Sequence, residues 1–304
     1  MIMRASEDNL ALLALASRPK FSWATTRLQI ERLGSPTAVL DASYDGQLIE
    51  TNREAELNAA ESRIAELEEH GIRVATLVSD DYPAALRTVH DAPPVLYWQG
   101  SISPRDVDAV AIVGTRRPSQ GGETFAHDLA HMLSEHDVPV VSGLARGIDT
   151  VAMRGSLEAG GRTIGVIGTG HGVYYPKENR ALQDLIAREH LLLSQFPPGA
   201  PATKATFPMR NVVMSGFSSA TVIAEAGETS GTRIQARAAV RHGRPLILSK
   251  HVAENLAWAR EMLGAGFDIS VADTAEEAVD LVLALHERRD RAAHGMSFGA
   301  LLSA

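Results

Sequence analysis

From about residue 107 onward, short apolar segments alternate with segments of helical spacing, and this alternation constrains the fold more than any other feature. Seven strands are expected, at DAVAIVG, VPVVSG, RTIGVIG, HLLLSQ, SATVIAEA, RPLILS and FDISVA. Helical segments lie between most of them, among them GETFAHDLAHMLSEH, IDTVAMRGSLEAG, KENRALQDLIARE, GTRIQARAAVRHG and AENLAWAREMLGAG. Apolar strands that alternate with helices are typical of a parallel sheet covered on both faces. The sequence therefore predicts an α/β fold with a doubly wound, mostly parallel sheet.

The first 70 residues follow a different pattern. NLALLALA, TTRLQIERLG and NREAELNAAESRIAELEEHG have helical spacing, and Gly71 is the expected C-terminal cap of the last helix. We predict a small all-helical (SAM-like) domain with an acidic linking helix at 1–70 and the sheet domain at 71–288. Within the latter, IRVATLVS is a strand candidate and DDYPAALRTVHDAPPVLYWQG reads as a Pro-rich connector. Residues 289–304 form a tail, expected to be poorly ordered or a peripheral helix.

The net charge of −8 is unevenly distributed along the chain. Ten Asp and Glu residues and three arginines lie between residues 45 and 81. The segment 201–250 is basic, with Lys204, Arg210, Arg233, Arg237, Arg241, Arg244 and Lys250 against Glu225 and Glu228. Such a division permits local binding of a polyanion despite the negative total, although solvated helix faces explain it equally well.

Composition also excludes several classes of protein. The chain contains no cysteine, so disulfides, thiolate metal sites and cysteine nucleophiles are excluded. Glu7 and Asp8 stand directly before the short N-terminal apolar run, which is unlike a signal peptide. No window approaches the roughly 18 apolar residues of a membrane span. We therefore expect a cytoplasmic protein without membrane association or cofactor.

Three glycine-containing loops follow consecutive strands of the expected sheet: GTRRPS at 114–119, SGLARGID at 142–149 and GTGHG at 168–172. Because ligands of such sheets bind beyond the carboxyl ends of the strands, we expect these loops side by side at one edge. The first loop lacks both the GxGxxG spacing of a dinucleotide site and the lysine of a Walker A loop. Arginine forks and loop N–H groups instead predict a track for phosphates. Its candidate residues are Gly114, Thr115, Arg116, Ser119, Gly143, Arg146 and Gly147, with Arg117 left as solvent-facing.

Two later segments extend this track. PPGAPATKATFPMRNVVMSG, at 197–216, is expected to be a long irregular loop, and such loops inside compact domains are usually functional. It mixes cations with an aromatic ring, the combination by which single-stranded nucleic acid is bound. The segment SGT at 230–232 opens the next helix, whose N-terminal N–H groups bind anions. The added candidates are Lys204, Phe207, Arg210, Asn211, Gly231 and Thr232, with a core role for the ring and a capping role for Arg210 as the alternative.

Metal and nucleophile sites are not expected. His127 and His131 have the spacing of metal ligands on a helix, but the surrounding sequence offers no HExxH and no third ligand. Ser142 stands before Gly143 without the GxSxG pattern of a nucleophile elbow. We expect no catalytic residue in this chain.

The motifs GTRRPS, VVSGLARGIDTVAMRGSLEAGGRTIGVIGTG, VYYPKEN, LLLSQFPPG and FPMRN follow one another as in the DprA/Smf family of DNA-processing proteins, which this chain resembles from about residue 8 to about 285. The resemblance implies an extended Rossmann-like sheet and no enzymatic activity. It further implies a basic pocket for single-stranded DNA, a homodimer formed through the sheet domain, and loading of a RecA-type recombinase onto incoming strands during natural transformation. The pocket of the family matches this chain at Gly114, Thr115, Arg116, Ser119, Lys204, Phe207, Arg210 and Asn211.

The chain departs from the family pattern in several places. Val212 stands where members commonly have a second arginine, and PLILSKHVAENL replaces a strand that usually ends in A-V-P-G. RPKFSWATT lacks the glycines of a helix-hairpin element, and the residues after the sheet domain are too few for a C-terminal winged-helix domain, so none is expected.

Two other functions use similar loops. A sensor of a nucleotide-derived signal would bind a small phosphate ligand without catalysis. The cytokinin-riboside phosphoribohydrolases (LOG) carry a PGGxGTxxE element, but here GETSGTRIQ places Gln235 where the catalytic glutamate would stand. A neutral amide cannot act as the acid or base of glycosidic cleavage.

Overall fold

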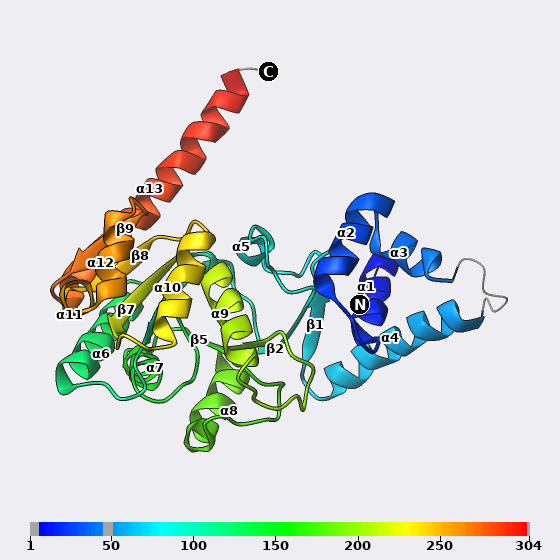
Figure 1. Ribbon diagram of the computed structural model, residues 1–304, viewed down its shortest axis with the longest axis horizontal. Helices are drawn as coiled ribbons and strands as arrows, with labels where there is room; N and C mark the ends of the chain where they lie inside the picture. Colours follow the sequence, from blue (N-terminus) through cyan, green and yellow to red (C-terminus); the bar gives the residue numbers. More distant parts are fainter. Residues whose placement is uncertain (1–5, 45–50, 303–304) are drawn as a thin grey trace.

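The computed structural model describes residues 6–44 and 51–302 (Figure 1). Within them nine strands form one sheet, in the order β1-β2-β6-β5-β4-β3-β7-β8-β9. The strands are β1 (Arg73–Thr76), β2 (Val95–Gly100), β3 (Val110–Gly114), β4 (Val140–Ser142), β5 (Thr163–Val166), β6 (Leu191–Ser194), β7 (Ala220–Glu225), β8 (Leu246–Ser249) and β9 (Ile269–Ala272). The pairs from β6 through β9 are parallel. The predicted α/β fold with a doubly wound, mostly parallel sheet is confirmed.

Strand β2 is a correction to the sequence analysis, which placed its residues in a Pro-rich connector. It pairs antiparallel with β1 on one side and with β6 on the other. Pro93 and Pro94 lie just before the strand, so every residue from Val95 onward has an N–H group for the hydrogen bonds of the sheet. The connector is therefore limited to the residues between β1 and β2, which include the short helix α5 (Ala84–Arg87).

Helices cover both faces of the sheet because successive strand residues point to opposite faces. One face packs on α9 (Thr206–Phe217), α10 (Thr232–Arg241), α11 (Lys250–Asn255) and α12 (Ala257–Gly264). The other packs on α6 (Gln120–Glu135), α7 (Ile148–Glu158), α8 (Arg180–Glu189) and α13 (Ala275–Leu302). In β3, Val110 and Ile112 belong to the second core and Ala111 and Val113 to the first. A sheet buried in this way holds its carboxyl-end loops on a rigid base.

The N-terminal helices are α1 (Glu7–Ser17), α2 (Trp23–Leu33), α3 (Pro36–Ala42) and α4 (Thr51–Glu69). They lie to one side of the sheet domain, next to β1 (Figure 1). Leu13, Leu67, Val95 and Tyr97 share one buried cluster, so the helices and β2 have a common core. Trp23 also donates its indole N–H to the carbonyl of Ala92 at 2.9 Å. The division at residues 70 and 71 stays a prediction, and this core crosses it.

Three further segments differ from or refine the predictions. Residues 206–217 form α9, so the segment 197–216 is irregular only in its first half. The helix expected at 253–266 is two helices, because Leu256 between them is extended. Helix α13 continues to Leu302 and its end projects from the body (Figure 1), which matches the peripheral-helix alternative for the tail. No helix of the described residues is long and apolar enough to cross a membrane.

Candidate nucleic-acid interface

The strand order reverses at β3, which lies between β4 and β7. A crevice at the carboxyl ends of the strands is expected at such a point. A cavity of about 500 Å³ opens there, lined by the loops that follow β3 and β7 and by residues of α9 and α10. A second cavity of about 350 Å³ adjoins it toward the loops that follow β4 and β5. The predicted placement of the glycine loops side by side at one edge is confirmed by this order.

The first loop places a cation at the rim of the cavities, whereas its serine is engaged in other hydrogen bonds. Arg116 is exposed and lines both cavities. Ser119 caps α6 by accepting the N–H of Gly122 at 3.1 Å and donates its hydroxyl to Glu225 at 2.7 Å. The N–H of Ser119 also points at this carboxylate, at 3.1 Å. Since Glu225 fills the anion position at the start of α6, Arg116 is the better placed of the two predicted phosphate ligands.

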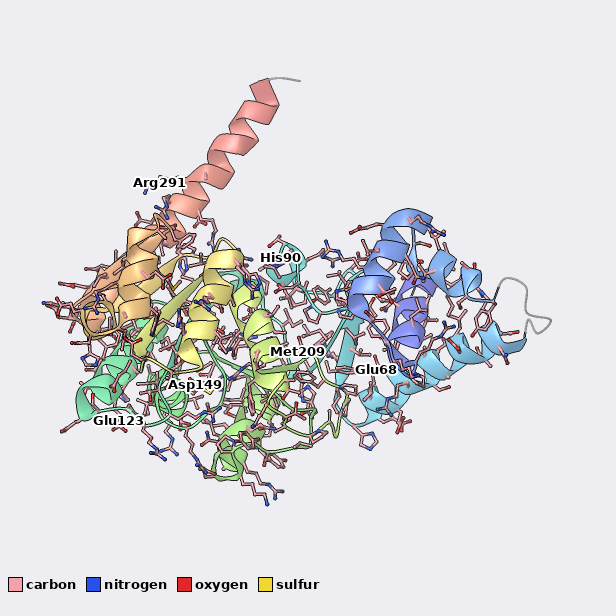
Figure 2. The ribbon with its side chains drawn as sticks, in the orientation of Figure 1. Glu68, His90, Glu123, Asp149, Met209 and Arg291 are labelled. Atoms are coloured by element: carbon pink, nitrogen blue, oxygen red, sulfur yellow. The ribbon has the colours of Figure 1, made fainter. Side chains whose placement is uncertain are left out.

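The second loop is pressed against the first. Gly147 has a φ of 73°, and a Cβ there would lie 2.4 Å from the carbonyl oxygen of Thr115. Only glycine permits both this backbone conformation and this approach. Burial raises the pKa of Asp149, while Arg210 and the N–H groups of the two loops oppose that rise. Asp149, labelled in Figure 2, accepts the N–H of Gly143 at 3.1 Å and so fixes the loop from below.

Arg210 is a buried residue that holds the loops together. Only 7% of it is exposed, and its Nη1 donates to the carbonyl oxygens of Gly143 at 2.6 Å and Val166 at 3.1 Å. The Nε of Arg210 donates to the Oδ1 of Asn211 at 3.0 Å, so these two predicted DNA-binding residues are bonded to each other. Burial lowers the pKa of Arg210 and the charge of Asp149 raises it. The guanidinium lines both cavities while it ties together the ends of two strands.

Phe207 stands between the two cavities and lines both. The guanidinium carbon of Arg116 lies 5.5 Å from the centre of its ring, within cation–π distance. The ring of Tyr175, which is 47% exposed, lies 5.3 Å away on a tilt of 47°. The ring of Phe207 is half-buried, so the core role considered for this residue accounts for only part of its surroundings. Two aromatic rings and an arginine thus form one partly open surface at the rim.

The remaining candidates lie around this surface. Arg146 is exposed, lines the second cavity and is paired with Glu178. Gly231 and Thr232 line the first cavity, where Thr232 donates its N–H to the hydroxyl of Ser230 at 3.2 Å. Lys204 is exposed one turn before Phe207 and is not among the residues that line either cavity. The structure therefore brings most of the candidates together, with Lys204, Ser119 and Gly147 outside the lining.

Sequence reasoning missed Tyr175 and Asp149 and saw Gln235 only as a replaced glutamate. Tyr175 had a signal, because it belongs to VYYPKEN, the segment that directly follows a glycine loop. Asp149 had a weaker one, as an acid in the first turn of a helix beside loop amides. The position of Gln235 in the wall of the cavity depends on how α10 packs on α9 and β7, which no local pattern reports.

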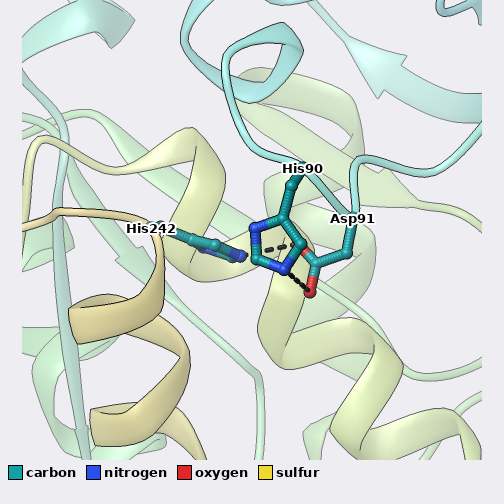
Figure 3. Close-up of side chains that lie close together, drawn as sticks. All are labelled: His90, Asp91 and His242. Carbon is teal, nitrogen blue, oxygen red and sulfur yellow. Dashed lines mark hydrogen bonds and ion pairs between the residues drawn. The ribbon is translucent and has the colours of Figure 1, made fainter.

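A second cluster of polar side chains lies at the C-terminal end of α10, where His90, Asp91 and His242 meet (Figure 3). His242 is bonded to Asp91 at 2.7 Å and to the hydroxyl of Ser215 at 2.9 Å. The order Asp–His–Ser resembles a hydrolase triad, but Ser215 is fully buried and cannot meet a substrate. The cluster joins the connector, whose His90 lies between the two units in Figure 2, to the end of α10.

The histidines with metal-ligand spacing contact neighbouring carboxylates. His127 contacts Asp128 and Glu158 at 3.0 and 2.9 Å, and His131 lies 3.7 Å from Glu135. Hydrogen bonds to these carboxylates, first to Glu158, raise the pKa of His127.

Several curated proteins are similar in sequence to this chain. Among curated proteins, DNA processing protein DprA of Streptococcus pneumoniae is 40% identical over 169 residues, or 56% of this chain and 60% of that protein. DprA of Bacillus subtilis is 38% identical over 182 residues, or 60% of this chain and 61% of that protein. This chain thus matches about three fifths of the length of each.

Two solved structures are similar over most of their length. The X-ray structure of S. pneumoniae DprA has a TM-score of 0.70 at 27% identity and covers 91% of this chain and 98% of that one. A Helicobacter pylori DprA structure, described for its single-stranded DNA binding mode, has a TM-score of 0.62 at 26% identity, covering 70% and 96%. The family described as DNA recombination-mediator protein A matches residues 73–275, which include every predicted site residue. This chain belongs to the DNA recombination-mediator protein A family.

Proposed function

We propose that this chain binds single-stranded DNA at the switch-point cavities and acts as a recombination mediator without catalysing a reaction. The observation that carries the proposal is the ring of Phe207, held between Arg116 and Tyr175 where the two cavities meet. Surfaces that bind single strands combine such rings with cations along a groove. The H. pylori relative, described for its single-stranded DNA binding mode, supports the same ligand.

In this proposal the phosphates are neutralised from the exposed rim. Arg116, Arg146 and Lys204 are exposed and lie on three different segments around the rings. Arg146 would exchange its contact with Glu178 for a phosphate, an exchange between exposed partners of low cost. Arg210, buried beneath them, adds positive potential and positions the loops. Thr115 and the N–H group of Gly231 line the first cavity as further predicted phosphate contacts, and Thr232 lies beside them.

The absence of catalysis is part of the proposal and rests on the chemistry of the cavity wall. Gln235 stands where the related phosphoribohydrolases carry their glutamate, and it is 1% exposed in the wall of the first cavity. The only buried carboxylate in that wall is Asp149 among the described residues, and it accepts hydrogen bonds from the loop backbone. Neither group has the free acid or base that glycosidic cleavage requires.

The family resemblance adds two partners to the proposal, a second copy of this chain and a RecA-type recombinase in transformation or recombination. A hollow between α10 and α12, lined by apolar side chains and by three arginines of α10, supports the first. Ile234 and Phe267, which are 44% and 49% exposed, line it together with Trp258 and Met262. Exposed apolar residues that gather in one hollow are a common feature of interfaces between subunits.

The proposal is tested by fluorescence anisotropy over a series of salt concentrations, with matched single-stranded and double-stranded oligonucleotides. We expect tighter binding of the single strand and a log–log salt slope of about −0.7 per phosphate contacted. Arg116→Ala and Lys204→Ala should each weaken binding and reduce the slope by the equivalent of one phosphate.

Arg188→Ala is the matched control, because Arg188 is also an exposed arginine, precedes β6 at the opposite edge of the sheet and pairs with Glu189. It should bind as the unchanged protein does. Equal affinity for both forms of DNA, or equal losses in Arg116→Ala and Arg188→Ala, would refute binding at the switch point.

A further inference from the structure

Gln235 is a buried polar side chain without a hydrogen-bond partner. It lies in α10 one turn after Thr232 and is 1% exposed. Neither Oε1 nor Nε2 has a partner in the part of the chain that the structure describes. Buried amides are normally paired, because an unmade hydrogen bond in the interior leaves the full cost of removing the group from water. The amide of Gln235 therefore calls for a partner that the chain itself does not provide.

The position of Gln235 indicates where that partner lies. Its side chain is part of the wall of the 500 Å³ cavity, opposite the loop that follows β3. Its neighbours along the helix, Ala236, Ala238 and Ala239, are buried alanines, so an apolar residue would satisfy the fold at this point. A cavity of this volume lies within the range of sites for small ligands.

The wall of the cavity limits the chemistry of the ligand. Asp149 is a buried carboxylate in the same wall, so a phosphate deep in the cavity would meet a negative charge. Arg210, the buried cation of this wall, already donates to the carbonyl oxygens of Gly143 and Val166 and lies near the charge of Asp149. The cation and the helix N–H group that are open to a phosphate lie at the rim, at Arg116 and at the start of α10. The deep part suits a flat, neutral group whose edge offers a donor next to an acceptor. Nucleobases have such edges, and a glutamine amide pairs with them through two hydrogen bonds.

We propose that the cavity holds one nucleobase and that the amide of Gln235 hydrogen-bonds to its edge while the phosphate stays at the rim. The base comes from a bound single strand, and in this the inference rests on the proposed function; a free nucleotide is the other source of the same chemistry. Base reading also changes one expectation, since a site that only tracks phosphates and stacks bases has slight sequence preference.

The test uses Gln235→Met, which keeps the length of the side chain and removes both polar atoms. Binding is measured by anisotropy on a short single strand and on the same strand made abasic. We expect the variant to bind the complete strand about tenfold more weakly, to bind the abasic strand as the unchanged protein does, and to keep the salt slope. Its melting temperature should be unchanged or higher, because two unpaired buried groups have been removed.

A structural role of the amide predicts the opposite, a lower melting temperature with unaltered discrimination between the two strands. Two results would overturn the inference. One is a melting temperature lowered by several degrees in both Gln235→Met and Gln235→Leu. The other is that the variant and the unchanged protein bind the complete strand with equal affinity and also bind a free nucleotide with equal affinity. Calorimetry with deoxyadenosine monophosphate separates the sources. If the unchanged protein binds this nucleotide but no single strand, and Gln235→Met loses the nucleotide, the base site is supported and only the proposal of single-strand binding is refuted.

Discussion

Replacement of Arg210 by methionine tests whether this arginine is a phosphate ligand or a support of the site. The guanidinium donates to the carbonyl oxygens of Gly143 and Val166, and its charge opposes the rise in the pKa of Asp149. Arg210→Met leaves both carbonyls and the buried carboxylate of Asp149 without this partner. We expect a large loss of stability in addition to weaker DNA binding.

The magnitude follows from the burial of both charges, which interact although no ion pair joins them. A buried charge left without its compensating charge costs about 3–5 kcal/mol. For a domain of this size, 1 kcal/mol corresponds to about 2–4 °C in melting temperature. We therefore expect Arg210→Met to melt roughly 6–20 °C lower. The double variant Asp149→Asn with Arg210→Met removes the unpaired charge and should recover part of the loss.

The assay is urea unfolding followed by circular dichroism, with Arg116→Met as the matched control. Arg116 is exposed and makes its ring contact on the surface, so its replacement should change the free energy of unfolding by less than 1 kcal/mol. Equal stability of Arg210→Met and the unchanged protein, together with a loss of DNA binding, would refute a supporting role and make Arg210 a direct ligand of phosphate.

Two further predictions concern stability at low pH and assembly. Burial lowers the pKa of His171 from 6.5 to about 4, so the unfolded chain takes up this proton at a higher pH than the folded protein does. The free energy of unfolding should therefore fall by up to about 3 kcal/mol as the pH drops from 6.5 to 4. In urea titrations at a series of pH values, His171→Gln should reduce this dependence on pH, and an unaltered dependence would contradict the assignment. Phe267→Asp should convert the expected dimer to a monomer, as measured by light scattering. The control Leu28→Asp, at a position on α2 that is 66% exposed, should leave the dimer intact. A dimer that persists in Phe267→Asp contradicts an interface at the hollow between α10 and α12.

The regular part of the fold could be predicted because each element repeats its own apolar pattern. Strand β2 was missed since its partners, β1 and β6, are defined by contacts distant in sequence. Helix α9 was missed because Pro208 and the three prolines that precede the helix suggested a loop. Pro208, however, lies in the first turn of the helix, where a backbone N–H has no partner within the helix and proline is tolerated.

The site was predictable where glycine and arginine mark a loop, and less so where burial decides the role. Arg116 was recognised as a rim cation from its loop alone, and the structure places it there. Arg210 looks equally basic in the sequence, yet its burial depends on carbonyls from β4 and β5 and on Asp149. The pairing of Tyr175 with Phe207 likewise joins segments more than 30 residues apart, which a local pattern cannot report.

The antiparallel strand β2 also determines how the chain can be shortened. A protein that starts after Gly71 would leave Val95 and Tyr97 facing water, because Leu13 and Leu67 cover them in the full chain. A protein that starts after Gly100 would instead strip β6 of its ladder partner and expose a row of free N–H and C=O groups, a template for aggregation. The helices at the N-terminus are thus a cover for the edge of the sheet, and the two parts of the chain need to be expressed together.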